Sequence, residues 1–287
     1  MGLAARREDL LGSRYLSSEV TRSPRGWRRY LHLYAAFLRF SFSKALQFRL
    51  DFYFRVVMDV VFYAVHLLFF TVIYRHTPAL GGWDLEQIYV FACGAMLVDA
   101  IHMTIFANNM WWLPIYINRG DLDYYLVRPV SSLFFLSMRE VAANSFLNMV
   151  LAGGLVAWSL VHHGGLGWGR ILIYLALLCL GAFIHYLVRV IFITPVFWLH
   201  SSRGLDEVAW TLNRLSEKPH QIYPGPMRWV LVTILPLAMT ASFPAHVLFD
   251  GLRLTTLLHV LAVTAGLFAF AVWFWNRGLR AYSSASS

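Results

Sequence analysis

Lysine is scarce in this chain: only Lys44 and Lys218 occur among its 24 basic residues. Neither lysine follows a glycine, as the phosphate-binding lysine of a G-x-x-x-x-G-K-[ST] loop does. This absence excludes a P-loop nucleotide site on the chain. Any work that ATP drives here would therefore need a second polypeptide.

Cysteine and catalytic motifs are also scarce. The two cysteines, Cys93 and Cys179, both lie in long apolar runs, where a thiol behaves as a small buried hydrophobe, so no disulfide framework is expected. The chain has no H-E-x-x-H and no G-x-S-x-G motif. His162 and His163 lie in a Gly-rich loop without cysteine or carboxylate neighbours in sequence, so we expect no metal site and no enzymatic activity.

Charged residues make up only 14% of the chain, whereas 59% of the residues are hydrophobic and the mean hydropathy is +0.57. Stretches of about 20 apolar residues have the length that crosses a bilayer as helix. The sequence therefore predicts an all-α polytopic membrane protein with six transmembrane helices. The expected spans are 54–74, 87–110, 136–161, 171–199, 227–248 and 254–276. The fifth is the weakest, because Pro236 and Pro244 interrupt it.

The distribution of arginine and lysine predicts the orientation. Basic loops are retained on the cytoplasmic side, and 20 basic residues fall before the first span, after the second and fourth spans, or in the C-terminal tail. Only Arg75, Arg170 and Arg253 fall on the opposite side. We expect both termini to be cytoplasmic. The net charge of +9 then reflects this retention and contact with anionic lipid, and it indicates no nucleic-acid partner.

The residues outside the spans divide into three segments. Residues 1–26 are charged and Ser-rich, which is typical of a flexible cytoplasmic tail, and 281–287 form a short C-terminal tail. In 27–53, polar residues recur every three or four positions opposite an aromatic face, which predicts an amphipathic helix in the inner headgroup region of the lipid. The alternative is a surface helix on a soluble subdomain. Residues 54–280 form the six-span domain.

Residues 115–130 follow the second span and predict a short cytoplasmic helix of about two turns. Gly120 can end one helix in a left-handed conformation, Asp121 can cap the next, and Arg128-Pro129 closes it. Leu122, Tyr125 and Leu126 share one face, which would offer an apolar surface to a partner. The alternative is a loop that only reverses the chain.

Six ionisable residues fall within the spans, where an ionised group is costly unless it is paired or hydrated. They form three pairs at helical spacing: Asp59 and His66, Asp99 and His102, and His185 and Arg189. Arg189 paired with one carboxylate is the simplest interpretation. A hydrated surface of a transport pathway and a proton relay are the alternatives.

Two stretches resemble the integral-membrane permeases of type-2 ABC exporters, in particular their six-span bacterial subfamily. N-R-G-D-L-D-Y-Y-L-V-R-P-V (118–130) is similar to the G-x-[LI]-D-x-x-L-x-R-P signature after the second span. Y-P-G-P-M-R-W-V-L-V-T-I-L-P-L-A-M-T-A-S-F-P-A (223–245) is similar to the pattern Y-P-x-x-[LI]-R…I-x-P…P-A. The similarity covers about residues 27–280 and leaves the N-terminal tail outside.

The resemblance implies a transporter of two permease subunits, identical or homologous, and two ABC ATP-binding subunits that hold ATP and Mg, with no cofactor on this chain. It implies an ATPase-coupling helix made by Arg119, Gly120, Asp121, Leu122, Asp123, Tyr124, Leu126, Arg128 and Pro129. It also implies an interfacial helix at 27–53 and a broken hairpin on the outer side around Pro236 and Pro244. It assigns no role to 200–220.

The leading functional hypothesis is thus the permease subunit of an ATP-driven ABC exporter. An ion-coupled secondary transporter that uses the intramembrane Asp, His and Arg groups is the alternative. A membrane-embedded enzyme acting on lipid would need a catalytic constellation at an interface, and the sequence contains none.

Overall fold

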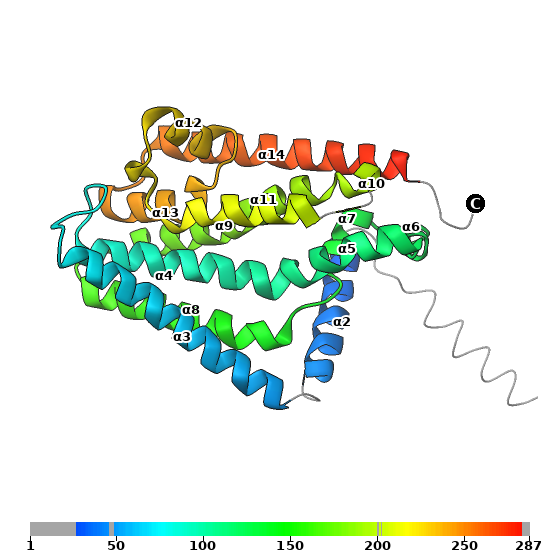
Figure 1. Cartoon of the computed structure of the whole chain (residues 1–287), viewed down its shortest axis with the longest axis horizontal. Helices are drawn as coiled ribbons and strands as arrows, with labels where there is room; N and C mark the ends of the chain where they lie inside the picture. The colour runs from blue at the N-terminus through cyan, green and yellow to red at the C-terminus, as the bar shows by residue number, and fades with distance from the viewer. Residues whose placement is uncertain (1–26, 46–48, 200, 202, 283–287) are drawn as a thin grey trace, which may run out of the picture.

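The computed structural model describes residues 27–45, 49–199, 201 and 203–282, and this part of the chain is helical with no β-strand. The helices are α2 (Trp27–Ala45), α3 (Arg49–Tyr74), α4 (Leu85–His102), η1 (Met103–Ala107, a π-helix), α5 (Asn108–Arg119), α6 (Asp123–Leu126), α7 (Ser132–Met138), α8 (Ala143–His163), α9 (Trp168–Ile193), α10 (Val196–Leu199), α11 (Arg203–Asn213), η2 (Arg214–Glu217), η3 (His220–Ile222), α12 (Gly225–Thr233), α13 (Ala238–Asp250) and α14 (Leu254–Ala281). The longest helices lie along one axis (Figure 1).

The bundle has two distinct ends (Figure 1). The α6 end contains α6 and the C-terminal end of α14, and the loop end contains the 75–84 loop. Within the described residues, five helical stretches are long and apolar enough to cross a membrane: Val56–Tyr74, Leu85–Arg119, Ser145–His163, Trp168–Leu199 and Leu254–Ala281. A bent helix pair would make a sixth. The expectation of an all-α polytopic membrane protein is confirmed.

The second span is longer than the expected 87–110. It continues from α4 through the π-helix η1 into α5 as one apolar stretch of 35 residues, which ends at Arg119. A capping box formed by Asp84 and Gln87 fixes its start, because each side chain accepts a hydrogen bond from the other residue's backbone N–H. The span therefore reaches from the loop end to α6.

The third span starts later than the expected 136, because the helix is interrupted between α7 and α8. The Asn109 side-chain amide donates to the carbonyls of Ser137 and Glu140 at 2.9 and 2.7 Å, and its oxygen accepts from the Glu140 N–H at 3.1 Å. Irregular backbone at membrane depth persists only where protein or water satisfies it. Asn109, on α5, therefore holds the break in place.

The expected fifth span, 227–248, is broken in the structure. Its residues form α12 and α13, two helices at 97° to each other. Pro236 lies in the bend, whereas Pro244 lies inside α13, which continues past it. His246 near the end of α13 contacts Trp83 of the loop end with ring centroids 5.3 Å apart. The pair is therefore a hairpin that opens toward the loop end.

The chain crosses the bundle instead through α11, η2 and η3, in the segment that sequence reasoning placed outside the membrane. α11 packs on α9, and η2 packs on α13 and α4. Pro219 and Gln221 then lie against Gly81 in the loop end. Lys218 therefore lies next to the loop end, away from the α6 end with which the sequence grouped it. The segment escaped hydropathy because about half of its residues are polar. Of these, Asn213, Arg214 and Glu217 line the interior polar space described below.

α2 covers Trp27–Ala45 of the expected interfacial segment, and residues 49–53 already belong to α3. α2 packs against α7, where the Tyr30 and Phe134 rings are 4.8 Å apart and the Phe37 and Phe135 rings 5.3 Å apart. The tails 1–26 and 283–287 lie outside the described residues.

Candidate functional site: an intramembrane hollow linked to the α6 end

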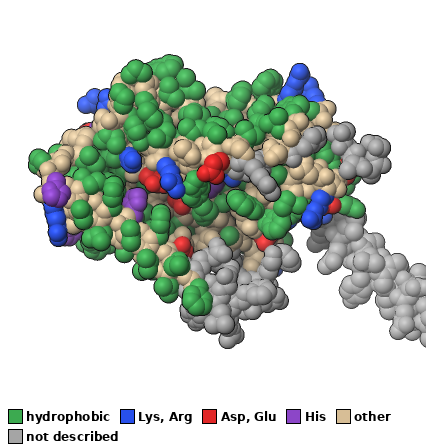
Figure 2. Space-filling view, viewed as in Figure 1, with side chains coloured by type: hydrophobic (Ala, Val, Ile, Leu, Met, Phe, Trp, Pro, Cys, Tyr) green, Lys and Arg blue, Asp and Glu red, His purple; other side chains and the backbone are tan. Residues whose placement is uncertain are grey.

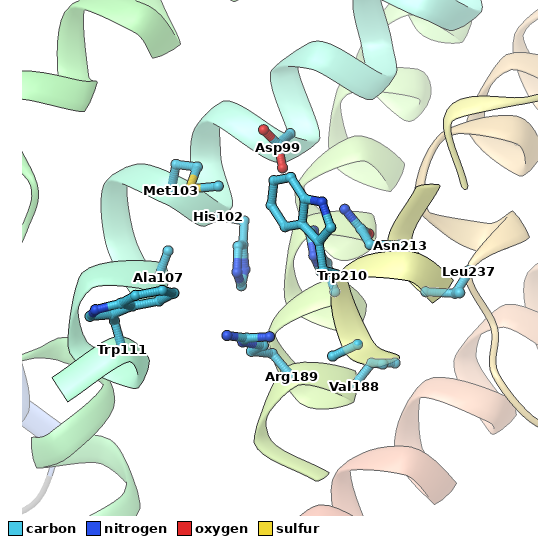
Figure 3. A pocket seen from close by; sticks show the side chains of 12 residues that line it. Asp99, His102, Met103, Ala107, Trp111, Val188, Arg189, Trp210, Asn213 and Leu237 are labelled. Carbon is cyan, nitrogen blue, oxygen red and sulfur yellow. The ribbon is translucent and has the colours of Figure 1, made fainter. Parts of the chain in front are cut away.

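A hollow lies between the middle parts of α4, α9 and α11 (Figure 3). It has a volume of about 130 Å³. Four of the six ionisable residues that the sequence singled out line it: Asp99 and His102 from α4, and His185 and Arg189 from α9. The remaining lining residues are Met103, Ala107, Trp111, Val188, Ala209, Trp210, Asn213 and Leu237.

Two histidines stack inside this hollow. The His102 and His185 rings are 3.9 Å apart at an angle of 12°, and their side chains are only 4% and 9% exposed. The Nδ1 atom of His102 has no hydrogen-bond partner among the described residues. Figure 3 shows Asp99 and Arg189 at opposite ends of the hollow. The geometry therefore favours a polar lining over an ion pair between these two side chains.

A second cavity of about 410 Å³ adjoins the first and shares Asp99, His185, Trp210 and Asn213 with it. It extends to α3 and η2, where it is lined by Tyr63, His66, Arg214, Glu217 and Lys218 among others. Figure 2 shows charged side chains gathered in the middle of a mostly hydrophobic face. Asp59, also on α3, lines neither of the two cavities.

Sequence reasoning missed the contribution of α11 and η2 to this hollow. The signal was present: Trp210, Asn213, Arg214 and Glu217 recur at i, i+3, i+4 and i+7 opposite an apolar stripe. We assigned no role to this amphipathic pattern because we placed it outside the membrane.

His162 and His163 form the end of α8 rather than part of a loop, so their expected position is wrong. His163 Nδ1 lies 3.5 Å from Glu86 Oε2, a carboxylate that sequence spacing did not bring near it. Among the described residues, no group of three or more His, Cys, Asp or Glu side chains could hold a metal ion.

At the α6 end, Gly120 ends α5 in the left-handed region with φ 78°, and its N–H donates to Ile117 at 3.3 Å. α6 is only four residues long, shorter than the two turns expected, and Leu122 rather than Asp121 occupies its N-cap. Leu122 is also fully buried, so its expected exposure to a partner is wrong. The exposed apolar side chains here are Tyr124 (73%), Leu126 (38%) and Val127 (82%).

Arg139, in the break before α8, binds α6 to α5. Its guanidinium donates from Nη2 to the Tyr116 hydroxyl at 2.6 Å and from Nη1 to the Tyr125 hydroxyl. It also lies 4.6 and 5.2 Å from the centroids of these two rings. Arg139 therefore fixes the position of α6 relative to the long rod α4–η1–α5.

Other predicted coupling residues lie around α6. Arg119 ends α5, Asp123 and Leu126 begin and end α6, and Arg128 stacks over Phe135 at 4.8 Å before Pro129 in the turn to α7.

At the end of α14, burial together with the charges of Asp123 and Asp121 raises the pKa of Tyr282. The Trp275 indole N–H donates to the Ser132 hydroxyl at 3.2 Å. The segment is thus packed against α7 and α14.

One continuous helical rod joins the two regions. His102, Met103, Ala107 and Trp111 of α4, η1 and α5 line the hollow, and Arg119 at the end of the same rod adjoins α6. π-Helical turns inside α-helices occur frequently at functional sites. The π-helix η1 lies in the part of this rod that lines the hollow.

Comparison with known families matches residues 60–286 to a family described as "ABC-2 family transporter protein". The matched range contains every residue of the hollow and of the α6 end, and leaves α2 outside. No curated protein and no solved structure matched the chain.

Proposed function

This chain belongs to the ABC-2 transporter family, and we propose that it is the membrane permease subunit of an ATP-driven exporter whose ATPase is a separate polypeptide. The observation that carries the proposal is the rod α4–η1–α5, which joins an exposed segment at the α6 end to an intramembrane polar hollow. ATP and Mg would bind to the partner, since this chain has no P-loop lysine.

The ATPase subunit would bind the exposed surface of α6 and the turn that follows it. Tyr124, Leu126 and Val127 are the apolar side chains exposed there. Leu122 and Tyr125 hold the segment from inside. Nucleotide binding can shift the conformational equilibrium of the permease only if this contact has a different free energy in the two ATPase states. Arg139 and Asn109 would pass the displacement of α6 to the break before α8.

A second permease subunit, identical or homologous, would cover the charged face. Arg214 and Lys218 are exposed there, at a depth where lipid cannot solvate a charge. A second subunit would enclose the hollow and complete a hydrated pathway.

In the proposed orientation the α6 end and both termini lie in the cytoplasm of a bacterial cell. The basic residues toward the loop end are Arg75, Arg170, Lys218, Arg228 and Arg253, whereas eleven basic residues precede residue 56. This bias follows the retention of basic segments inside the cell.

The first test is capture of the ATPase through Val127. We expect the tagged chain to copurify an ATP-hydrolysing subunit from native membranes, and Val127→Asp to reduce its recovery about tenfold or more, because a charge replaces an apolar contact. Val161→Asp is the matched control. Val161 is 81% exposed, as Val127 is, but it lies in the last turn of α8, far along the chain from α6. Absence of an ATPase from the wild-type eluate, or its full retention by Val127→Asp, would contradict the proposal.

An ion-coupled carrier is the second candidate, favoured by the ionisable lining of the hollow. It predicts pH-dependent flux by the purified chain in vesicles with no ATPase present. An inactive chain under these conditions would exclude it.

A further inference from the structure

An apolar groove lies between α2, η1 and α7, outside the hollow described above. It has a volume of about 330 Å³ and is lined by Tyr30, Leu31 and Tyr34 of α2, by Ile105 and Phe106 of η1, and by two residues of α7. Every lining side chain is apolar or a tyrosine, and Leu31 is 56% exposed. Open apolar surfaces of this kind mark interaction sites.

Hydrogen bonds hold α2 in place on both sides of the groove. The Ser131 N–H, just before α7, donates to the Tyr30 hydroxyl at 3.5 Å. The Val141 N–H, in the break before α8, donates to the Ser41 hydroxyl at 3.0 Å. Tyr34 lies between these two attachments along α2. The groove is therefore formed before a ligand arrives, as binding pockets usually are.

The position of the groove along the second span gives its depth in the membrane. Ile105 follows Leu85, the first residue of that span, by 20 residues. At about 1.5 Å per residue this distance is about 30 Å, the thickness of the hydrocarbon core. α2 also runs across the long axis of the bundle near the α6 end, as a helix in the membrane interface does (Figure 1). The groove therefore lies where acyl chains join their head groups, so lipid chains are the apolar molecules that reach it.

The charge of the surrounding segments favours one class of lipid. α2 contains four arginine or lysine residues and no aspartate or glutamate. Arg28 and Arg29 directly precede Tyr30, in the first turn of the helix. Residues 127–139, which include α7, contain two arginines and likewise no acidic residue. Basic residues close to the membrane surface attract anionic lipids, so these two segments favour an anionic head group over a neutral one.

We propose that this groove binds one acyl chain of an anionic phospholipid, whose head group lies over the first turn of α2. The volume of the groove is at the lower end of the range of ligand pockets, about 300–1,000 Å³, which suits a single chain. The chain contacts Phe106, whose ring stacks on Tyr186 of α9 at 4.3 Å, so bound lipid packs η1 against α9. This lipid site lies beyond the proposed function. It depends on the α6 end lying at the inner leaflet but not on an ATPase.

The experiment is photo-crosslinking of the full-length protein in phosphatidylcholine vesicles. The probes are trace amounts of phosphatidylglycerol or phosphatidylcholine with a diazirine on one acyl chain, and mass spectrometry locates the labelled residues. We expect phosphatidylglycerol to label Leu31 or Ile105 about tenfold more than phosphatidylcholine does. Leu68 and Phe69, exposed on α3, are the internal reference, and the two probes should label them equally.

Three results of this labelling would count against the site. Equal labelling of the groove by the two probes would overturn the anionic head group. Groove labelling no stronger than that of Leu68 would overturn a defined site. An unlabelled groove, the result if a protein segment or a second subunit fills it, would overturn lipid as the occupant.

Matched variants of α2 locate the acyl chain. Leu31→Asp should reduce the labelling of Ile105 by phosphatidylglycerol about tenfold or more, because it places a negative charge in an apolar groove. Ala36→Asp is the control, since Ala36 is also exposed on α2 but does not line the groove. Leu31→Gln removes the apolar contact without adding charge and should reduce labelling about fivefold, which covers the case in which Leu31→Asp does not fold. Labelling of Ile105 in the Leu31 variants equal to that in Ala36→Asp would overturn the proposal.

The basic first turn of α2 is tested by a double variant. Arg28→Gln combined with Arg29→Gln should abolish the preference for phosphatidylglycerol over phosphatidylcholine. Arg6→Gln combined with Arg7→Gln removes the same charge from the N-terminal segment and should leave the preference unchanged. A preference that survives the first pair of substitutions, or that both pairs reduce equally, would overturn the position of the head group. The assay contains no ATPase, so failed labelling counts against the groove alone, and failure to capture an ATPase counts against the proposed function alone.

Discussion

Gly181→Ala is expected to destabilise the protein by about 3 kcal/mol, at the upper end of the cost of inserting a methyl group into a packed interior. A Cβ atom at Gly181 on α9 would lie 2.2 Å from the carbonyl oxygen of Thr240 and 2.8 Å from its Cα. Both are backbone atoms of α13, so no side-chain rotation can relieve the clash. The whole hairpin would have to move away from α9.

The sequence explains why this carbonyl approaches so closely. Pro244 has no N–H, so it cannot donate the usual helical hydrogen bond to Thr240, four residues before it. The Thr240 carbonyl is therefore available to face the Cα of Gly181, a contact that supports close helix packing in membranes. Leu237 and Thr240 of the same hairpin line the two cavities, so its displacement would also open the hollow.

The measurement is the melting temperature of the detergent-purified protein, followed by size-exclusion chromatography after heating. Gly153→Ala in α8 is the matched control, since nothing lies within 4 Å of a Cβ added there. That variant should be neutral or more stable by up to about 1 kcal/mol, because alanine favours helix. Equal melting temperatures for the two variants would show that α9 and α13 do not meet at Gly181.

The spans that hydropathy located well are those with continuous apolar runs. The expected starts of α3 and α14 as spans agree with the structure within two residues, because apolar residues predominate in both runs and their polar residues, such as Asp59, His66 and His259, are isolated. The crossing through α11 and η2 could not be found in this way. Its apolar side chains cover only one face, and the hollow that its polar face lines is made by α4 and α9, which only the folded structure brings beside it.

The candidate site was partly predictable for a physical reason. Asp99, His102, His185 and Arg189 were recognisable because ionisable groups within a span need polar surroundings, and the structure brings them to one hollow. Leu122 was misjudged because helical spacing shows which residues share a face but not which way a four-residue helix points. The turn at Gly120 directs Leu122 inward, against Leu133 and Trp275 in the same apolar cluster.

Arg139→Met is expected to uncouple ATP hydrolysis from the permease while the complex still assembles. The substitution removes two hydrogen bonds from a charged donor to Tyr116 and Tyr125, each worth about 2 kcal/mol, and frees α6 from α5. The exposed surface at Tyr124 and Val127 stays in place, so binding of the ATPase should persist. We expect the stimulation of ATPase activity by the reconstituted permease to fall about tenfold or more.

Control variants distinguish a loss of coupling in Arg139→Met from misfolding and from the loss of a positive charge. Arg139→Lys keeps the positive charge, but a lysine ammonium cannot donate to the Tyr116 and Tyr125 hydroxyls in the fixed planar geometry of a guanidinium. This variant should therefore show more ATPase stimulation than Arg139→Met but less than wild type. Arg170→Met, near the loop end, should behave as wild type. Tyr116→Phe and Tyr125→Phe complete a double-mutant cycle with Arg139→Met, in which the combined effect should be smaller than the sum because all three remove the same contacts. Wild-type stimulation by Arg139→Met, or strict additivity with the tyrosine variants, would show that α6 transmits its movement without this arginine.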